Sequence, residues 1–251
     1  MNDNVKRENR KALPKFLLIL LGAAVFGGVL GFLTGWMGYS NASDLVVEAV
    51  DYLIGRVVPW LIPAASLALL AAAVWQYRRA RALFAAWDGE AEEPIDAADM
   101  RLNVALLLTS IVMALNFFLL PASWYIDWER GPILADGFFI LVMIAVMLLQ
   151  QKVVDLTRRM NPEKRGSVYD MKFQKKWLDS CDEAERLQIG QAAYRAYRTT
   201  TMACLVLWVA LLVLDMIFGF GLLPVFVVLL LWGILQVTYI LECIRLEKRK
   251  R

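Results

Sequence analysis

Histidine is absent from this chain of 251 residues, and only three cysteines are present. Without histidine, the chain has neither the commonest general base nor the commonest metal ligand of proteins. Cys181, Cys204 and Cys243 have no CxxC spacing, so we expect reduced, structural thiols rather than a zinc or redox motif. The sequence therefore predicts a protein without a metal site.

Recognised catalytic motifs are missing as well. The chain contains no Walker motif, HExxH, GxSxG or dinucleotide fingerprint. Glycines do recur between residues 16 and 38, but they lack the strand–turn–helix setting that phosphate binding requires. The acidic stretch at residues 88–99 is typical of a solvated connector. These absences predict a protein that is not an enzyme and that holds no cofactor.

Apolar residues, in contrast, make up 59% of the chain and give a mean hydropathy of +0.52. An average soluble domain is about 45–50% apolar. A helix of about 20 apolar residues crosses the hydrocarbon core of a bilayer. Such blocks lie at about 16–38, 57–75, 102–124, 132–149, 201–220 and 222–242. We therefore expect an all-α polytopic protein with six transmembrane helices in three hairpins, forming a single membrane domain over residues 1–251.

Lysine and arginine are sorted to one side of these predicted spans. Of the 27 basic residues, all except Arg56 and Arg130 fall in the amino-terminal segment, the second loop, the fourth loop or the carboxy-terminal tail. Basic residues of short loops are retained in the cytoplasm. We therefore predict that both termini and the segment 152–200 are cytoplasmic. The first apolar run exceeds the 7–15 residues of a signal-peptide core, which indicates an uncleaved anchor.

Small residues recur every four positions along the first two spans. They are Ala23, Gly27, Gly31 and Gly35 in the first span and Ala64, Ala68 and Ala72 in the second. Such stripes allow two helices in a membrane to approach closely. The pattern predicts that these two spans pack as an antiparallel pair within one chain. A homodimer seam and a pore-lining face are the alternatives.

Asp215 lies inside the predicted fifth span, where an unpaired carboxylate costs a few kcal/mol. In one interpretation it is a structural cap, satisfied by Asp136, Asn116 or Arg130. In the other, Asp215 and Asp136 form an outward acidic recess for a cation or a cationic peptide. The second interpretation leads to the alternative function of a transporter or transporter subunit, although few other polar residues lie within the spans.

The segment 152–200 is the longest soluble stretch. Its aromatic residues recur at i, i+4 and i+8 beside three lysines: Tyr169, Phe173 and Trp177, with Lys172, Lys175 and Lys176. This pattern predicts a helix that lies against anionic lipid or packs on protein. Ser180 and Glu183 match a capping box, which would begin a second helix leading into the fifth span. We therefore expect a cytoplasmic helical hairpin. Interrupting acidic residues and the lack of a known motif predict no direct binding to nucleic acid.

The run NPEKRGSVYDMKFQKKWLDSCDEAE at residues 161–185 resembles a family of uncharacterised membrane proteins of Gram-positive bacteria, catalogued as domain of unknown function 3169. The membrane pattern on both sides is similar to that family too. The resemblance implies a bacterial plasma-membrane protein, often encoded beside a small helix-turn-helix regulator. It supplies no catalytic residues.

Together these patterns predict a non-enzymatic plasma-membrane protein for sensing, immunity or regulation. Its outer surface would meet a ligand. The segment 152–200 would meet a cytoplasmic protein partner, such as the helix-turn-helix regulator, while the bilayer solvates the spans.

Overall fold

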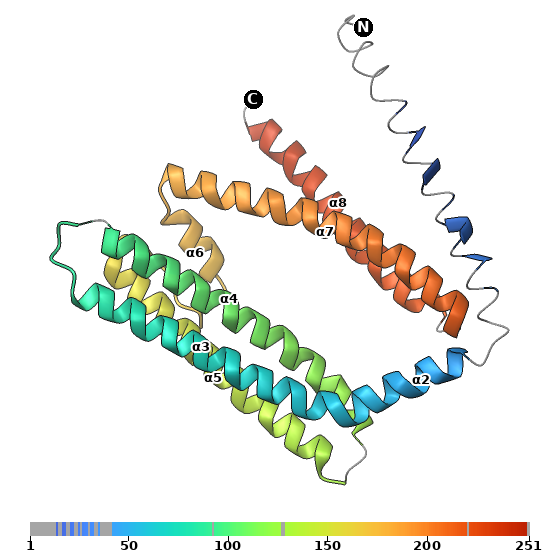
Figure 1. Ribbon diagram of the computed structural model, residues 1–251. Coiled ribbons are helices and arrows are strands. Elements are labelled where there is room, and N and C mark those ends of the chain that lie inside the picture. The colour runs from blue at the N-terminus through green and yellow to red at the C-terminus, as the bar shows by residue number, and fades with distance from the viewer. Residues whose placement is uncertain are drawn as a thin grey trace, which may run out of the picture. The chain divides into compact units, whose positions relative to one another are not determined.

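The computed structural model describes residues 42–91, 93–126, 129–219 and 221–249, together with scattered helical positions between residues 14 and 35. Among these residues it contains seven α-helices and no strand (Figure 1). The helices are α2 (Ala42–Tyr52), α3 (Val58–Ala85), α4 (Glu93–Ala122), α5 (Gly131–Met160), α6 (Phe173–Asp179), α7 (Glu183–Phe218) and α8 (Leu223–Arg249). A π-helical turn, Leu53–Val57, joins α2 to α3. The predicted all-α class is confirmed.

Five helical stretches of the described residues are long and apolar enough to cross a membrane. They are Val46–Ala85, Glu93–Tyr125, Gly131–Met160, Glu183–Met216 and Leu223–Lys248. This is the pattern of a multi-pass membrane protein, and each stretch contains most of one of the last five predicted spans. The first predicted span, residues 16–38, lies largely outside the described residues.

α3 and α5 extend well beyond the predicted spans: α3 continues past residue 75 to Ala85, and α5 continues past residue 149 to Met160. α7 runs without a break from Glu183 to Phe218, in agreement with the prediction of a helix that leads from the connector into the fifth span. A helix of 30 residues, such as α4 or α5, is about 45 Å long, whereas the hydrocarbon core is about 30 Å thick. The ends of these helices must therefore project from the hydrocarbon.

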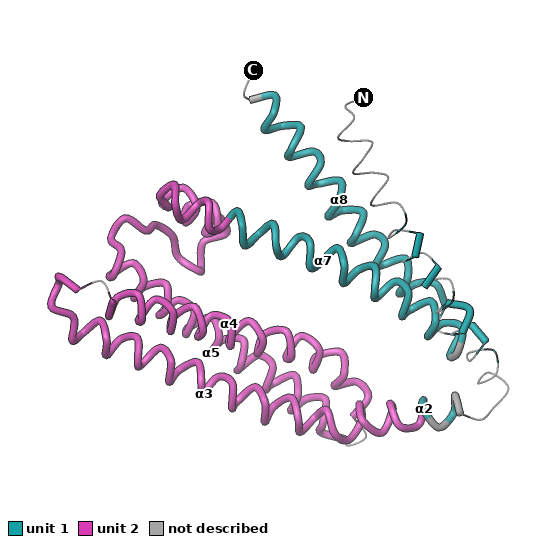
Figure 2. The backbone as a smooth tube through the Cα atoms, turned by 45° about the horizontal axis from the view of Figure 1, so that its top comes forward, with its two compact units in different colours: residues 1–47, 190–251 teal, residues 48–189 magenta. Residues whose placement is uncertain are grey.

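The chain divides into two compact units, shown in different colours in Figure 2. Unit 1 comprises residues 1–47 and 190–251, with most of α7 and all of α8. Unit 2 comprises residues 48–189, in which α3, α4 and α5 lie side by side. They are followed by a connector, residues 161–182, that contains α6 and leads into α7. The boundary between the two units lies within α7, where unit 2 ends at Ile189 and unit 1 resumes at Gly190.

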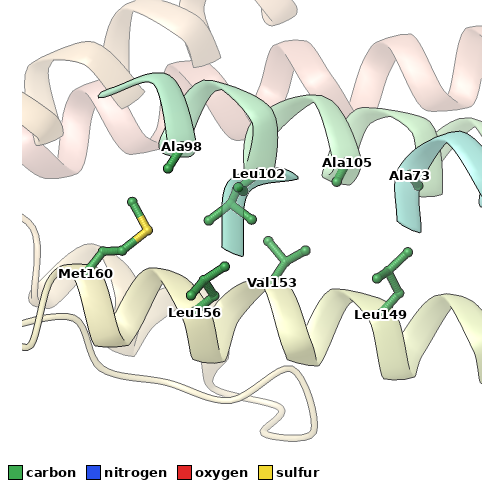
Figure 3. Close-up of a cluster of buried hydrophobic side chains, with 9 residues drawn as sticks. Ala73, Ala98, Leu102, Ala105, Leu149, Val153, Leu156 and Met160 are labelled. Carbon is green, nitrogen blue, oxygen red and sulfur yellow. The ribbon is translucent and has the colours of Figure 1, made fainter. Parts of the chain in front are cut away.

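A seven-residue repeat organises the core of unit 2. The most deeply buried residues of α4 and the turn after it, each at most 1% exposed, follow one another at alternating steps of four and three: Ala98, Leu102, Ala105, Thr109, Val112, Asn116, Leu119 and Ser123. This spacing is that of helices packed with a left-handed supercoil. In Figure 3, Leu102 and Ala105 of α4 face Val153 and Leu149 of α5. The three helices thus form a coiled-coil-like bundle.

Polar side chains occupy three successive layers of this repeat, each fully buried on α4 or in the turn that follows it. Each layer forms a hydrogen bond to a neighbouring helix. The pairs are Thr109–Gln150 (3.2 Å), Asn116–Ser66 (2.8 Å) and Ser123–Asp136 (3.1 Å). The oxygen of the Asn116 amide has no hydrogen-bond partner among the described residues. Interhelical hydrogen bonds therefore link this stretch to α3 once and to α5 twice.

The hydrogen bond between Asn116 and Ser66 predicts a coupling that a double-mutant cycle can measure. Such bonds contribute on average about 0.6 and at most about 1.7 kcal/mol within membranes. For Asn116→Val combined with Ser66→Ala, we expect a coupling of about 1 kcal/mol in the free energy of unfolding in mixed detergent micelles. Ser110→Ala is the control, since Ser110 donates its hydrogen bond to Leu106 of its own helix. Additive effects of Asn116→Val and Ser66→Ala would contradict the prediction.

The small-residue stripe of the second span is not the face that α3 buries in unit 2. Ala64 and Ala68 are not buried, and neither is Ala72. The buried face instead carries Ser66 and Ala73.

Of the first-span stripe, Ala23 lies outside the described residues, whereas Gly27, Gly31 and Gly35 are helical. A Cβ atom built at any of the three glycines meets no atom within 4 Å. Packing between the first two spans therefore stays a prediction.

Candidate functional site

The connector between α5 and α7 is built around a buried lysine. The Lys164 side chain is 7% exposed, and its ammonium forms an ion pair with the Glu185 carboxylate of α7. The same ammonium donates a hydrogen bond to the Cys181 sulfur (3.4 Å) and lies 5.9 Å from the centroid of the Trp177 ring. No sequence pattern pointed to this site, because a lysine in a turn-rich stretch is usually solvated.

Burial on its own would lower the pKa of the Lys164 ammonium, since it disfavours the charged form. Hydrogen bonds to Glu185 and Cys181 outweigh this effect, and the pKa is raised above its ordinary value. Lys164 is therefore held as a cation inside the connector.

A reciprocal capping box begins α7. The Asp182 side chain accepts a hydrogen bond from the Glu185 amide (2.7 Å), and the Glu185 side chain accepts one from the Asp182 amide (3.1 Å). The predicted box of Ser180 and Glu183 was therefore wrong by two residues. Ser180 instead accepts a hydrogen bond from the Arg165 amide (3.1 Å). Because Glu185 also pairs with Lys164, the start of α7 and the connector form one network.

The predicted aromatic stripe is only partly helical. α6 begins at Phe173, and its Phe173 and Trp177 rings lie with centroids 5.6 Å apart. Tyr169 lies in a turn before this helix and is exposed. The three lysines are exposed too: Lys172, Lys175 and Lys176.

An ion pair of α6 and two hydrogen bonds to α5 hold this part of the connector in place. Lys176 forms an ion pair with Asp170, and this contact lowers the pKa of the Asp170 carboxyl below its ordinary value. The Gln151 side chain of α5 accepts hydrogen bonds from Ser167 Oγ (3.0 Å) and the Val168 amide (2.9 Å). The connector is therefore fixed to α5 as well as to α7.

A cavity of about 590 Å³ lies between the connector and the ends of α4 and α5. Its apolar wall includes Leu102 and Val153, which also belong to the core cluster of Figure 3. Its charged lining residues are Asp99, Lys164 and Glu185. No group of three or more Cys, Asp or Glu side chains in the described part of the chain is arranged to hold a metal ion. The arrangement is that of a binding cavity with a mixed apolar and charged wall.

Asp215 has a local partner. Its carboxylate accepts a hydrogen bond from the Gly221 amide (2.6 Å), across the turn that joins α7 to α8. Gly219 and Gly221 adopt positive φ angles of 65° and 79°, which favour glycine, so this turn depends on both.

The other two residues of the predicted polar site have different partners. Asp136 accepts a hydrogen bond from Ser123, and the Asn116 amide donates to Ser66 and to the Val112 carbonyl. Asp215 belongs to unit 1, whereas Asp136 and Asn116 belong to unit 2, so the predicted grouping of the three residues stays a prediction. Within unit 1, the hydrogen bond from the Gly221 amide gives Asp215 the geometry of a structural cap.

Asp215→Ala should lower the free energy of unfolding by about 1 kcal/mol, the usual effect of losing a side-chain cap. Asp215→Asn keeps an acceptor oxygen for the Gly221 amide and should retain most of the stability. Thermal unfolding of both variants in the same detergent measures the difference. Equal losses in the two variants would show that the hydrogen bond does not stabilise the turn.

Comparisons with known proteins match most of the chain to one family. No curated protein and no solved structure shows a significant match. Residues 10–243 match the family described as "Protein of unknown function (DUF3169)". This match includes the connector, the cavity and nearly all of the five apolar helices. The chain belongs to the DUF3169 family, as the resemblance of residues 161–185 indicated.

Proposed function

We propose that this protein is a non-enzymatic regulatory or sensing protein of the bacterial plasma membrane, which acts through the segment 152–200. The observation that carries the proposal is the network of Lys164, Glu185 and Asp182, which joins the connector to the start of α7. An ion pair whose ammonium is buried favours one conformation of the connector, and a loop that presents a defined surface to a partner benefits from such a conformation.

The exposed side of the connector supports binding to a partner. Tyr169, Lys172 and Lys175 are all exposed, next to a segment that Lys164 and Gln151 hold in place. An aromatic ring beside two cations suits an acidic protein surface, such as an acidic patch on the helix-turn-helix regulator that the family resemblance suggests.

The proposal includes six spans with both termini in the cytoplasm. The support is the sorting of basic residues, which favours the connector and both termini on one side of the bilayer. Reporter fusions at Glu90 and at Glu129 test it. We expect cytoplasmic activity at Glu90 and periplasmic or extracellular activity at Glu129, and the reverse result would refute this topology.

The alternative of a transporter that uses Asp215 has less support. The Asp215 carboxylate is engaged by the Gly221 amide, which leaves it less available as a site for a transported ion. A coupling residue would normally lie in a chain of polar groups along the substrate path.

Crosslinking in intact cells tests the regulatory proposal. A photoreactive residue at Tyr169 should capture a distinct protein from the native membrane, and Lys172→Glu combined with Lys175→Glu should abolish the capture. Lys248→Glu, at the exposed end of α8, is the control for a charge reversal outside the connector and should leave the capture unchanged. Capture that persists in the double variant, or no capture at all in wild-type cells, would refute the proposal.

A further inference from the structure

The cavity between the connector, α4 and α5 contains the carboxylate of Asp99, which forms no ion pair with any described residue. Lys164 supplies the positive charge of the lining, and its ammonium is already paired with Glu185. Asp99 of α4 accepts a hydrogen bond from the Asn103 side chain (3.3 Å), and within the described residues it has no ion-pair partner. The three ionised side chains of the lining therefore carry a net charge of −1, and Asp99 is the one outside the ion pair, with Lys164 acting on it only at longer range.

The remaining wall is suited to an apolar body with a positive charge. Leu102, Val153 and Val154 are buried and line the cavity with the rings of Phe173 and Trp177. Aromatic faces attract cations. The ammonium of Lys164 lies over the Trp177 ring, so this ring already accommodates a cation. A volume of about 590 Å³ is also within the range of small-molecule sites.

We propose that this cavity binds a lipophilic cation, that is, an organic ammonium or phosphonium ion with an apolar body. Its charge lies against Asp99, and its body lies against the aliphatic and aromatic wall. Such amphiphiles concentrate at the surface of a bilayer, where the ends of long membrane helices emerge.

The proposal deepens the regulatory function and rests on it for its biological meaning, because it supplies the ligand class for the same segment. The lining also includes Glu185, Gln188 and Ile189 of the first turns of α7. A bound cation would therefore contact the same helix start that Lys164 anchors.

Equilibrium dialysis of the purified full chain in a non-ionic detergent tests the proposal. The probe is tetraphenylphosphonium, and tetraphenylborate serves as an anion of nearly the same shape. Asp99→Asn removes the charge but keeps the size of the side chain, and we expect it to weaken phosphonium binding about tenfold or more. Asp96→Asn is the matched control, because Asp96 is exposed on the same helix and does not line the cavity.

A second variant keeps the test decisive if Asp99→Asn proves unstable. Gln174 is an exposed lining residue of α6, so Gln174→Lys adds a positive charge without disturbing the core. It should also weaken binding of the phosphonium. Equal affinity for phosphonium and borate, unchanged binding in Gln174→Lys, or equal losses in Asp96→Asn and Asp99→Asn would overturn the proposal. Because dialysis needs no partner protein, this result is separate from the crosslinking result that tests the regulatory function.

Discussion

Lys164→Met should release the connector, residues 161–182, while α3, α4 and α5 stay folded. Methionine fills a similar volume but leaves the Glu185 carboxylate, the Cys181 sulfur and the Trp177 ring without the cation that joins them. Removing one partner of a buried ion pair costs about 3–5 kcal/mol. Because the Glu185 side chain is 39% exposed, we expect the lower end, about 3 kcal/mol.

Hydrogen exchange of the connector amides measures this loss, which corresponds to about a hundredfold faster exchange. Lys172→Met is the matched control, since Lys172 lies in the same segment but is exposed. The folded state has the higher pKa, so the contribution of Lys164 is complete below the unfolded value of 10.5 and is lost as the pH rises through the raised pKa. Equal exchange in both variants at neutral pH would contradict the role of Lys164.

Gly166→Ala should displace the Phe173 ring and destabilise the connector by about 3 kcal/mol. Gly166 has a φ of 132°, which strains any residue that carries a side chain. In addition, the new Cβ would lie 2.8 Å from Cδ2 and 3.2 Å from Cε2 of Phe173. Backbone strain and steric overlap therefore act together at this position.

Gly89→Ala separates these two causes. Gly89 also has a positive φ, of 91°, but a Cβ there meets no atom within 4 Å. We expect a loss of about 1 kcal/mol from backbone strain alone. Hydrogen exchange of residues 86–92 and of the connector, in both variants, measures the difference. A Gly166→Ala effect no larger than that of Gly89→Ala would show that contact with Phe173 contributes nothing.

The five described spans could be predicted from the sequence because an uninterrupted run of about 20 apolar residues is rare outside membrane helices. The helix ends could not, because charged residues mark the boundary of the hydrocarbon and not the end of a helix. Arg78, Arg79 and Arg81 are good helix formers, and α3 runs through them to Ala85. The helices end where the backbone demands it, as at Asn161 before Pro162 and at Gly219.

The candidate site was harder to predict for a different reason. The sequence drew attention to residues 161–185 through their aromatic residues and lysines, but Lys164 and Asp99 are single charged residues in charged surroundings. Their environment depends on residues that are distant along the chain. Lys164 pairs with Glu185, 21 residues away, and Asp99 of α4 lines the same cavity as both. A pattern of near neighbours, such as the aromatic stripe, carries no information about such contacts.

The polar layers of α4 and its following turn also restrict how the α3–α5 bundle can move. Thr109, Asn116 and Ser123 are seven residues apart, so sliding α4 by one turn would place each polar group against an apolar neighbour. A slide of two turns, about 10.5 Å along the axis, would bring polar layers together again, but Thr109 or Asn116 would then meet a partner on a different helix from its present one. These hydrogen bonds therefore fix the axial register of the bundle, and any rearrangement of its helices should be a pivot or a rotation without translation along the axis.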